Sequence, residues 1–592
     1  MKQTRNQVLL DFFPFEQYRE PLPNQEKALE FIERNNGNAI IELPTGSGKT
    51  AVGYTHLRAC NQISGGPVFY IVPNKTLVEQ VSQLHPDVKV AYGRREHSCL
   101  HYLEQGKNLP CSSLLPCPHR VDKETGETVE EGAEPCPYYQ AIYELKQGGI
   151  GCVSTAFYLY NMLFGKNFEI PDGLVIDEVH DLASTVRNCL SYEISDYHLS
   201  KSVELLNSFA PDQAEHLRNF LKTMIRVIKS RRPKTREILN PEELELLMEA
   251  IAPIDRVKLR KGVDAAIKAG VINLDDHAEI VDRLETLVYE VARYYRSFEF
   301  SLESAQRHAL NYTYAYWKEE LVGNERKQYV LVIKSYYVAG LIKMILSPKT
   351  VAYSATVGDP DIIGYETGFK APFLSLPSDF PPDNTRIYMP TDTPWLSYKK
   401  MRRGDKNRTM RKTARACKHF NKHGIRCLVV VISNEEREKF MSLCEEEKVS
   451  AITYGNGIAP REAATKFKEG EGSVLVGTEA NYAEGVDLPK QIAPVIFYLR
   501  PGWPSPKDPN TKFEEQRFGK LVWRIWGWRI MVKIQQVRGR NVRSMKDIGV
   551  TIFVSQGFRN LVYASLAKWL IPAYRGDFSF DEAVEDALEL LK

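Results

Sequence analysis

The sequence predicts an α/β protein with two parallel-sheet domains, and three observations carry that prediction. A Gly-rich stretch, Thr45 to Thr50, follows apolar Ala39 to Ile41, which we interpret as the end of a buried strand. The acidic pair Asp177-Glu178 follows a second apolar run, Leu174 to Ile176. Past Gly358 a second series of strand-like runs begins. Strands alternating with helical segments are typical of parallel sheets covered by helices.

The composition is that of a water-soluble protein with an ample core. A length of 592 residues predicts roughly three to five domains of about 150 residues. A net charge of +3 is near balance, so any nucleic-acid-binding surface must be local. We see no apolar run near the roughly 20 residues that span a bilayer and no secretory signal, and we expect no membrane association. The ten cysteines are therefore not expected to form disulfides, and we expect a cytoplasmic or nucleoid-associated protein.

The Gly-rich stretch has the chemistry of a phosphate-binding loop. Its expected phosphate ligands are consecutive: Thr45, Gly46, Ser47, Gly48, Lys49 and Thr50. Two glycines let the backbone N–H groups surround an anion, and a helix that begins near Lys49 adds its positive end. Lys49 can reach the β- and γ-phosphates, and the Thr50 hydroxyl can ligate Mg²⁺. For this motif alone an idle turn is the alternative.

The acidic pair supplies the second half of such a site. Asp177 and Glu178 stand at the carboxyl end of a strand, where open α/β sheets bind ligands. Asp177 can hold the Mg²⁺ shell, and Glu178 can orient and deprotonate an attacking water. Either motif alone could be structural, for example an acidic helix cap. Both in this order predict hydrolysis of a nucleoside triphosphate.

Three further features have two interpretations each. Gln25, ahead of the loop, can recognise an adenine edge or simply begin a helix. Ser354 and Thr356 can couple the phosphate site to a nucleic-acid strand or simply end a strand. Between Lys399 and Lys418 ten Lys or Arg face a single Asp, which favours a solvated helix face or a phosphate track equally.

Four cysteines in a Pro-rich segment predict a metal centre. Intervals of 11, 5 and 18 residues separate Cys99, Cys111, Cys117 and Cys136. Thiolates so grouped in a cytosolic protein ligate an iron–sulfur cluster or Zn²⁺. None of the pairs has Cys-x₂-Cys spacing, which favours iron–sulfur. Unligated buried cysteines are the alternative.

Residues 190 to 325 predict a helical insertion into the first domain. Two apolar stripes at helical spacing support this, at Leu217 to Ile228 and Ile280 to Val291, and we interpret both as core. Strand-like composition resumes at Tyr329 to Ile333 and at Val351 to Thr356.

The second domain contains a basic motif near its end. Its predicted strands are Cys427 to Ile432, Val474 to Val476, Val495 to Leu499 and Ile552 to Val554. Gln536, Arg540 and Arg543 fall near one helical face. Guanidinium groups so placed can stabilise a γ-phosphate in the transition state across a cleft, unless they are exposed surface arginines.

Together these motifs resemble the superfamily 2 helicases, in the iron–sulfur branch that contains XPD and DinG. The phosphate loop resembles motif I, Asp177 to His180 the DEAH-type motif II, and Ser354 to Thr356 motif III. Glu484 to Asp487 resembles motif V, and Gln536 to Arg543 motif VI, although Arg538 departs from the family pattern.

The resemblance implies two RecA-like domains that bind ATP and Mg²⁺, with Gly485, Asp487 and Gln536 contributing to the nucleotide site. It implies a first RecA-like domain at 1–95, 141–190 and 326–358, a [4Fe–4S] domain at 96–140 on the four cysteines, an Arch-like domain at 191–325, and a second RecA-like domain at 359–592. The implied activity is ATP-driven 5′→3′ translocation on single-stranded DNA and unwinding of forked duplex DNA.

We expect a monomer, with the insertion available to protein partners. Two alternatives stay open at this point. One is an RNA or protein–nucleic-acid remodeller that translocates without unwinding, and the other is a regulatory scaffold switched by ATP.

Overall fold

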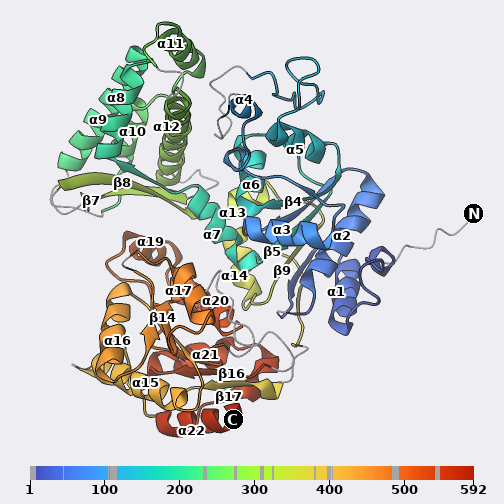
Figure 1. Cartoon of the computed structure of the whole chain (residues 1–592), viewed down its shortest axis with the longest axis vertical. Helices are drawn as coiled ribbons and strands as arrows, with labels where there is room; N and C mark the ends of the chain where they lie inside the picture. Colours follow the sequence, from blue (N-terminus) through green and yellow to red (C-terminus); the bar gives the residue numbers. More distant parts are fainter. Residues whose placement is uncertain are drawn as a thin grey trace, which may run out of the picture.

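Three β-sheets organise the described residues, two of them parallel and one antiparallel (Figure 1). The structure is a computed structural model, and it describes residues 9–44, 46–104, 106, 117–230, 237–272, 277–306, 312–322, 326–378, 382–396, 402, 404–455, 457–482, 492–539 and 547–592. The two parallel sheets form two lobes, and the antiparallel sheet belongs to an insertion in the first lobe. The α/β class predicted from the sequence, with two RecA-like domains, is confirmed.

The first lobe is built on seven parallel strands. These are β1 (Ala39–Glu42), β2 (Pro67–Val72), β3 (Lys89–Val90), β4 (Gly149–Ser154), β5 (Gly173–Asp177), β9 (Thr350–Ser354) and β10 (Phe373–Ser375). Their order across the sheet is β10-β1-β9-β5-β2-β4-β3. Because β10 pairs with β1, the first lobe extends past residue 358, where the sequence predicted its end. The helices of this lobe are α1 (Pro23–Arg34), α2 (Lys49–Ser64), α3 (Lys75–Leu84), α4 (Leu100–Leu103), α5 (Pro137–Lys146), α6 (Thr155–Leu159), α7 (Val179–Cys189), α13 (Ala339–Lys343) and α14 (Pro360–Thr367).

This strand order brings the predicted motifs to one edge of the sheet. β9 lies between β1 and β5, and in register Glu42 is opposite Ser354 while Asp177 is opposite Tyr353. Because all three strands are parallel, their carboxyl ends meet at the same edge. The phosphate loop after β1, the acidic pair after β5 and Ser354 at the end of β9 are therefore neighbours.

Helix α2, which carries the phosphate loop's lysine, packs very close to the sheet. A Cβ added to Gly53 would lie 2.7 Å from the Tyr353 hydroxyl and 2.9 Å from atoms of Tyr70 and Val175. Only glycine permits this approach without displacing the sheet. The closeness fixes the start of α2 relative to the strand ends.

The insertion has its own sheet and core. Its strands are β6 (Tyr192–Ser195), β7 (Tyr312–Val322) and β8 (Arg326–Tyr337), paired antiparallel in the order β6-β8-β7. Its helices are α8 (Asp196–Asn207), α9 (Pro211–Ser230), α10 (Pro241–Ala250), α11 (Arg256–Lys268) and α12 (His277–Ala305). In Figure 1, α8, α9, α10 and α12 lie on one side of the sheet, and α11 lies at their far end from it. Both apolar stripes lie in this core, on α9 and α12.

The insertion differs from the sequence expectation in one respect. Tyr329 to Ile333, interpreted as a resumed strand of the first lobe, lie in β8 and pair with β6 and β7 instead. The insertion is thus helical with a three-stranded base. Composition alone identifies a strand but not its partner, because the pairing depends on distant residues.

The second lobe is a second seven-stranded parallel sheet. Its strands are β11 (Thr385–Tyr388), β12 (Cys427–Val431), β13 (Ala451–Ile452), β14 (Val474–Thr478), β15 (Val495–Tyr498), β16 (Gly549–Phe553) and β17 (Tyr574–Arg575). The four strands predicted here correspond to β12, β14, β15 and β16. The helices are α15 (Asp405–Asn421), α16 (Asn434–Glu446), α17 (Pro460–Lys468), α18 (Glu479–Tyr482), α19 (Pro509–Phe518), α20 (Leu521–Arg538), α21 (Arg559–Ser565) and α22 (Phe580–Leu591).

Helix α20 belongs to both lobes by its packing. Ile525, Trp528 and Val532 lie in the core of the first lobe. Ile530 and Ile534, on the other side of the helix, lie in the core of the second. A residue spacing of three and four places each set on one helical face. The two lobes are therefore joined by a buried helix and not only by surface contact.

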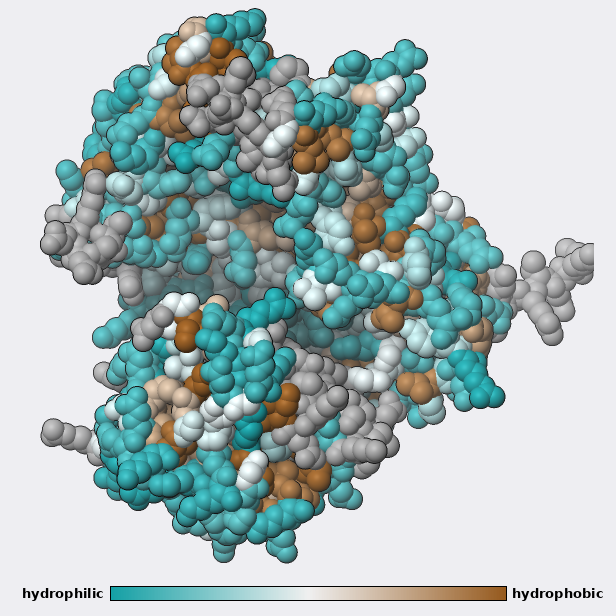
Figure 2. Space-filling view, in the orientation of Figure 1, coloured by the Kyte–Doolittle hydropathy of each residue, from teal (hydrophilic) through white to brown (hydrophobic). Residues whose placement is uncertain are grey.

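Apolar residues are concentrated in these cores rather than on the surface. The face of the molecule in Figure 2 is mostly hydrophilic, with hydrophobic residues in small, separate patches. Among the described residues, no helix combines the length and the apolar character that crossing a membrane requires.

Candidate functional site

The phosphate loop has the local backbone geometry that anion binding needs. Gly46 and Gly48 adopt φ values of 87° and 69°, which other residues rarely reach. Helix α2 begins at Lys49, so its N-terminal N–H groups and Thr50 in its first turn face the loop. The hydroxyl of Ser47 donates to the carbonyl of Pro44 at 2.6 Å and braces the turn. Thr45 lies outside the described residues.

Gln25 supports the loop from the start of α1. Its Nε2 donates to the Gly48 carbonyl at 3.1 Å, and its Oε1 accepts from the Leu22 N–H at 2.8 Å. Both ends of the amide therefore bind the chain itself, and the side chain is buried. This arrangement holds the loop, while adenine recognition by Gln25 stays a prediction that requires the amide to change partners.

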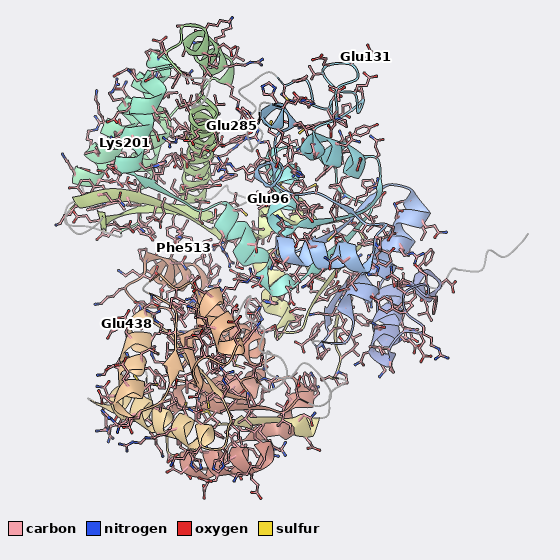
Figure 3. The ribbon with its side chains drawn as sticks, in the orientation of Figure 1. Glu96, Glu131, Lys201, Glu285, Glu438 and Phe513 are labelled. Atoms are coloured by element: carbon pink, nitrogen blue, oxygen red, sulfur yellow. The ribbon has the colours of Figure 1, made fainter. Side chains whose placement is uncertain are left out.

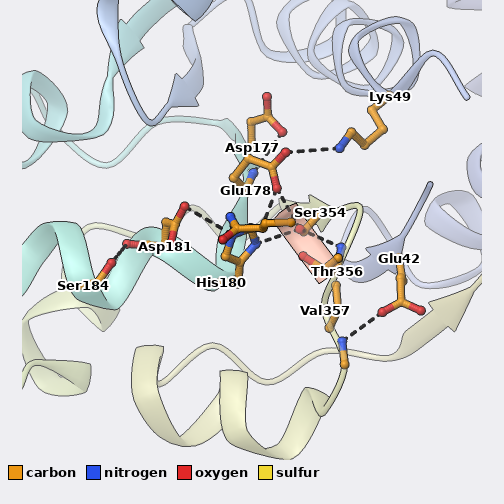
Figure 4. A network of polar contacts seen from close by, with 12 residues as sticks. Glu42, Lys49, Asp177, Glu178, His180, Asp181, Ser184, Ser354, Thr356 and Val357 are labelled. Carbon is orange, nitrogen blue, oxygen red and sulfur yellow. Dashed lines mark hydrogen bonds and ion pairs between the residues drawn. The ribbon is translucent and has the colours of Figure 1, made fainter. Parts of the chain in front are cut away.

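The acidic pair faces Lys49 (Figure 4). The Nζ of Lys49 lies 3.3 Å from Oε1 of Glu178, and the Glu178 N–H donates to Oδ1 of Asp177 at 2.9 Å. Glu178 has a positive φ of 49°, which is unusual for a residue other than glycine. Such strain is common at functional sites, and here it turns Glu178 toward the loop as α7 begins.

The two carboxylates have opposite electrostatic environments. Burial raises the pKa of Asp177, and the neighbouring Glu178 carboxylate raises it further. Burial would also raise the pKa of Glu178, but Lys49, His180 and the Ser354 hydroxyl outweigh it and lower that pKa. Glu178 is therefore ionised at neutral pH, as a group that accepts a proton from water must be.

A hydrogen-bonded relay extends from Glu178 to the second lobe. Ser354 Oγ donates to Glu178 Oε2 at 2.7 Å and accepts from the Thr356 N–H at 3.0 Å. Because that hydroxyl proton is used, His180 Nδ1–H must donate to Ser354 Oγ, at 2.7 Å. His180 Nε2 lies 3.2 Å from Oδ2 of Asp181, which raises the pKa of the ring, and 2.5 Å from the side-chain amide nitrogen of Gln536.

The relay brings together residues that the sequence places far apart. Lys49, Glu178, Ser354 and Gln536 were each singled out in the sequence, and one chain of contacts joins them. His180 was quoted in motif II but given no role of its own. The signal that could have found it is its spacing: two residues beyond Glu178, it lies in the first turn of α7.

A cavity of about 920 Å³ lies beside this relay, between the lobes. Glu42, Pro44 and Thr356 line it from the first lobe, and Arg538 and Trp569 from the second. Burial lowers the pKa of the Arg538 guanidinium to about 10. Among the described residues Arg538 has no carboxylate within ion-pair distance; its Nε donates to Gln535 Oε1 at 2.9 Å. The size of the cavity is that of a small-molecule site.

Three of the four motif cysteines gather at one place. Cys99 and Cys136 are buried in a small core with Tyr102 and Tyr139. Cys117 stands two residues before His119, whose carbonyl accepts from the Cys136 N–H at 2.7 Å, and burial, with Cys99 and Cys136 adding to it, raises the Cys117 pKa. The donor set suits a soft metal centre. Cys111 lies outside the described residues, and in the part of the chain that is described no group of three potential ligands is arranged to hold a metal ion.

The comparisons with known proteins agree with this arrangement. Residues 416–573 match the family "Helicase C-terminal domain", and residues 19–134 match "Type III restriction enzyme, res subunit". A curated protein described as a probable ATP-dependent helicase of Methanocaldococcus jannaschii is 23% identical over 93% of both chains. A solved XPD helicase has a TM-score of 0.58 at 19% identity, covering 94% of this chain and 99% of the other. The chain has the XPD helicase fold.

A second solved XPD structure supports the same assignment. The Xpd4 protein of S. tokodaii matches with a TM-score of 0.51 at 13% identity, covering 93% of this chain and 98% of the other.

Four residues that the sequence predicts at the nucleotide site lie outside the described residues: Gly485, Asp487, Arg540 and Arg543.

The part of the basic run from Asp405 onward lies on α15 and is largely neutralised within the second lobe. The ion pairs are Lys406–Glu436, Arg408–Asp405, Arg411–Glu446, Arg411–Glu447, Lys412–Asp392, Lys412–Asp581 and Arg415–Glu447. This pairing favours the helix-face interpretation over a phosphate track for the described part of the run.

Glu479, in the segment after β14, gives a pH-dependent stability prediction. Burial raises its pKa from 4.5 to about 7, opposed by Lys533. In the unfolded chain Glu479 ionises near pH 4.5, whereas in the folded protein its pKa is about 7. The folded state therefore loses stability as the pH rises above 4.5, and the loss is complete above about pH 7. Glu479→Gln should stabilise the XPD fold at pH 8, by up to about 3 kcal/mol, and hardly at pH 4.5. Thermal melts at both pH values test this, and an equal gain at both would contradict it.

Proposed function

We propose that this protein is an ATP-dependent DNA helicase that translocates 5′→3′ on single-stranded DNA and unwinds forked duplex. The relay from Lys49 to Gln536 is the observation that carries the proposal, because it links the phosphate site of one lobe to the other. A nucleotide-dependent change at Glu178 thereby reaches the second lobe directly. A motor needs such a link, whereas a simple hydrolase does not.

The nucleotide would be held by the first lobe and completed by the second. Gly46, Ser47, Gly48 and Lys49 would cradle the phosphates, while Thr50 and Asp177 would hold Mg²⁺. Glu178 would take the proton of the attacking water. In the second lobe the proposed contacts are Gln536 and, outside the described residues, Gly485, Asp487, Arg540 and Arg543.

We include a [4Fe–4S] cluster in the proposal. The gathering of Cys99, Cys117 and Cys136 supports it, with Cys111 as the fourth ligand. Four thiolates are the usual ligands of such a cluster, which would cross-link loops that have little core of their own. The cluster would give this segment the rigidity that a strand-separating element needs.

Nucleic-acid-stimulated ATP hydrolysis and strand separation test the function. We expect ATP turnover to rise on adding single-stranded DNA, and forks with a 5′ tail to be unwound in preference to forks with a 3′ tail. Stimulation of ATP hydrolysis without unwinding would identify a translocase or remodeller. Repeating the assays with RNA in place of DNA shows which nucleic acid the protein prefers. Turnover that ignores all nucleic acids would favour a regulatory scaffold.

A further inference from the structure

One arginine of helix α20, Arg529, contacts three parts of the molecule at once. Arg529 Nη2 lies 2.9 Å from Oε1 of Glu366, on α14 of the first lobe. Its Nη1 lies 2.7 Å from Oε1 of Glu514, on α19 of the second lobe. Nη2 also donates to the Tyr336 hydroxyl at 3.2 Å, on β8 of the insertion. Both lobes and the insertion thus meet at one guanidinium.

The acids that Arg529 contacts are buried and have other donors. The Glu366 side chain is 3% exposed and also pairs with Arg187 of α7. Glu514 is 1% exposed and also accepts from the indole N–H of Trp526. Burial would raise the pKa of Glu366, but the two arginines outweigh it and lower it.

Burial of such a charge network calls for an explanation other than stability. Desolvation cancels much of the attraction in a buried ion pair, and apolar residues of similar volume are often as stabilising. Directional charge pairs instead hold the helices that carry them in one defined arrangement. The neighbouring contacts are apolar: Phe513 of α19, labelled in Figure 3 where the helix meets the insertion sheet, packs on Tyr336 with ring centroids 5.3 Å apart.

The contacts between α7 and α20 show which arrangement the charge network around Arg529 fixes. His180 and Arg187 are seven residues apart on α7, and Gln536 and Arg529 are seven apart on α20. Seven residues are two helical turns, or about 10.5 Å, so each pair shares a face. His180 contacts Gln536 at one end, and Arg187 reaches Arg529 through Glu366 at the other. The two helices therefore run antiparallel, and their two contacts are separated by seven residues on each helix.

We propose that Arg529 is a positioning residue that sets the register of α20 along α7 and so brings Gln536 to His180. Through Tyr336 the same residue makes this contact dependent on how the insertion sits on α19 and α20. The inference deepens the proposed function, on which it rests, by naming how the insertion regulates the hydrolytic site.

The test compares Arg529→Met with Arg524→Met. Arg529→Met removes the shared contact but leaves Arg187 to Glu366 and Trp526 to Glu514, so each buried acid keeps a hydrogen-bond donor. Arg524 is a matched control, because it also joins α20 to the first lobe, through Asp359 and Asp361, but is 52% exposed. Exposed pairs contribute little.

We expect Arg529→Met to lower kcat for ATP about tenfold with little change in ATP affinity, the size of one lost charged hydrogen bond. Arg524→Met should keep the wild-type kcat. A double variant with Gln536→Ala separates positioning from general damage. If Arg529 acts through Gln536, Arg529→Met should slow the Gln536→Ala protein no further.

Each outcome decides the inference. Wild-type kcat in Arg529→Met, or additive losses in the double variant, would overturn it. Should Arg529→Met not fold, Arg529→Lys takes its place, since lysine cannot bridge both acids; unchanged kcat would again overturn the inference. If the wild-type protein hydrolyses no ATP, the proposed function falls too, whereas an active wild type with an unaffected Arg529→Met removes the inference alone.

Discussion

Glu178→Gln is expected to lower ATP turnover by about 10²–10⁴-fold, the usual contribution of a general base. Glutamine has nearly the same shape and can still accept from Ser354, but it cannot take a proton from water. The lowered pKa of Glu178 shows that the native group is ready to do so at neutral pH. ATP binding should persist, since Lys49 and the loop are unchanged. Nucleotide affinity and single-turnover hydrolysis measure the two effects separately.

Lys49→Ala provides the contrasting variant. Removal of the amine should weaken nucleotide affinity itself, because this is the charge that reaches the phosphates. It also leaves Glu178 without its 3.3 Å partner. If Lys49→Ala and Glu178→Gln lost nucleotide affinity equally, Glu178 would not be the general base. Normal ATP turnover in Glu178→Gln would also exclude that role.

Cys136→Ser is expected to abolish duplex unwinding and remove bound iron while leaving basal ATP hydrolysis largely intact. Cys136 immediately precedes α5, and its N–H donates to the carbonyl of His119 at 2.7 Å, so it closes the cysteine segment. A metal that links such loops supplies much of their folding free energy. Anaerobically purified wild-type protein should contain roughly four iron per chain.

Cys189→Ser is the control, because this thiol lies at the end of α7, outside the cysteine segment. It should keep both iron and unwinding. Stoichiometric zinc without iron in the wild-type protein would replace the cluster by a zinc site. Metal-free protein that still unwinds forks would remove the metal centre from the proposal.

Much of the fold was predictable because its signals are local. The phosphate loop, the acidic pair and the strands that precede them follow from short runs of residues, and the two helical stripes follow from spacing. Antiparallel pairing of β8 was not predictable, because Tyr329 to Ile333 have the same composition as the buried parallel strands. β8 pairs along its length with β7, which precedes it in the chain, and in part with β6, more than a hundred residues earlier.

The contacts of the site were less predictable than its members. Nothing local in the sequence shows that Gln536 meets His180, 356 residues away, or that Arg529 lies between two buried acids. Such pairings arise from the packing of α20 against α7, which depends on the whole core of both lobes. The isolated sequence around Arg529 is simply a largely apolar helix with scattered basic residues.

The strand order of the first lobe has a consequence for synthesis on the ribosome. β1, which leads into the phosphate loop, pairs only with β9 and β10 within the described sheet, and its first residue is opposite Val351. At translation rates of about 5–20 residues per second, β1 therefore waits roughly 15–60 s for a neighbour. During that interval its apolar residues are exposed to misfolding and to chaperones, whereas the insertion, with strands that pair among themselves, can fold as soon as β8 has emerged.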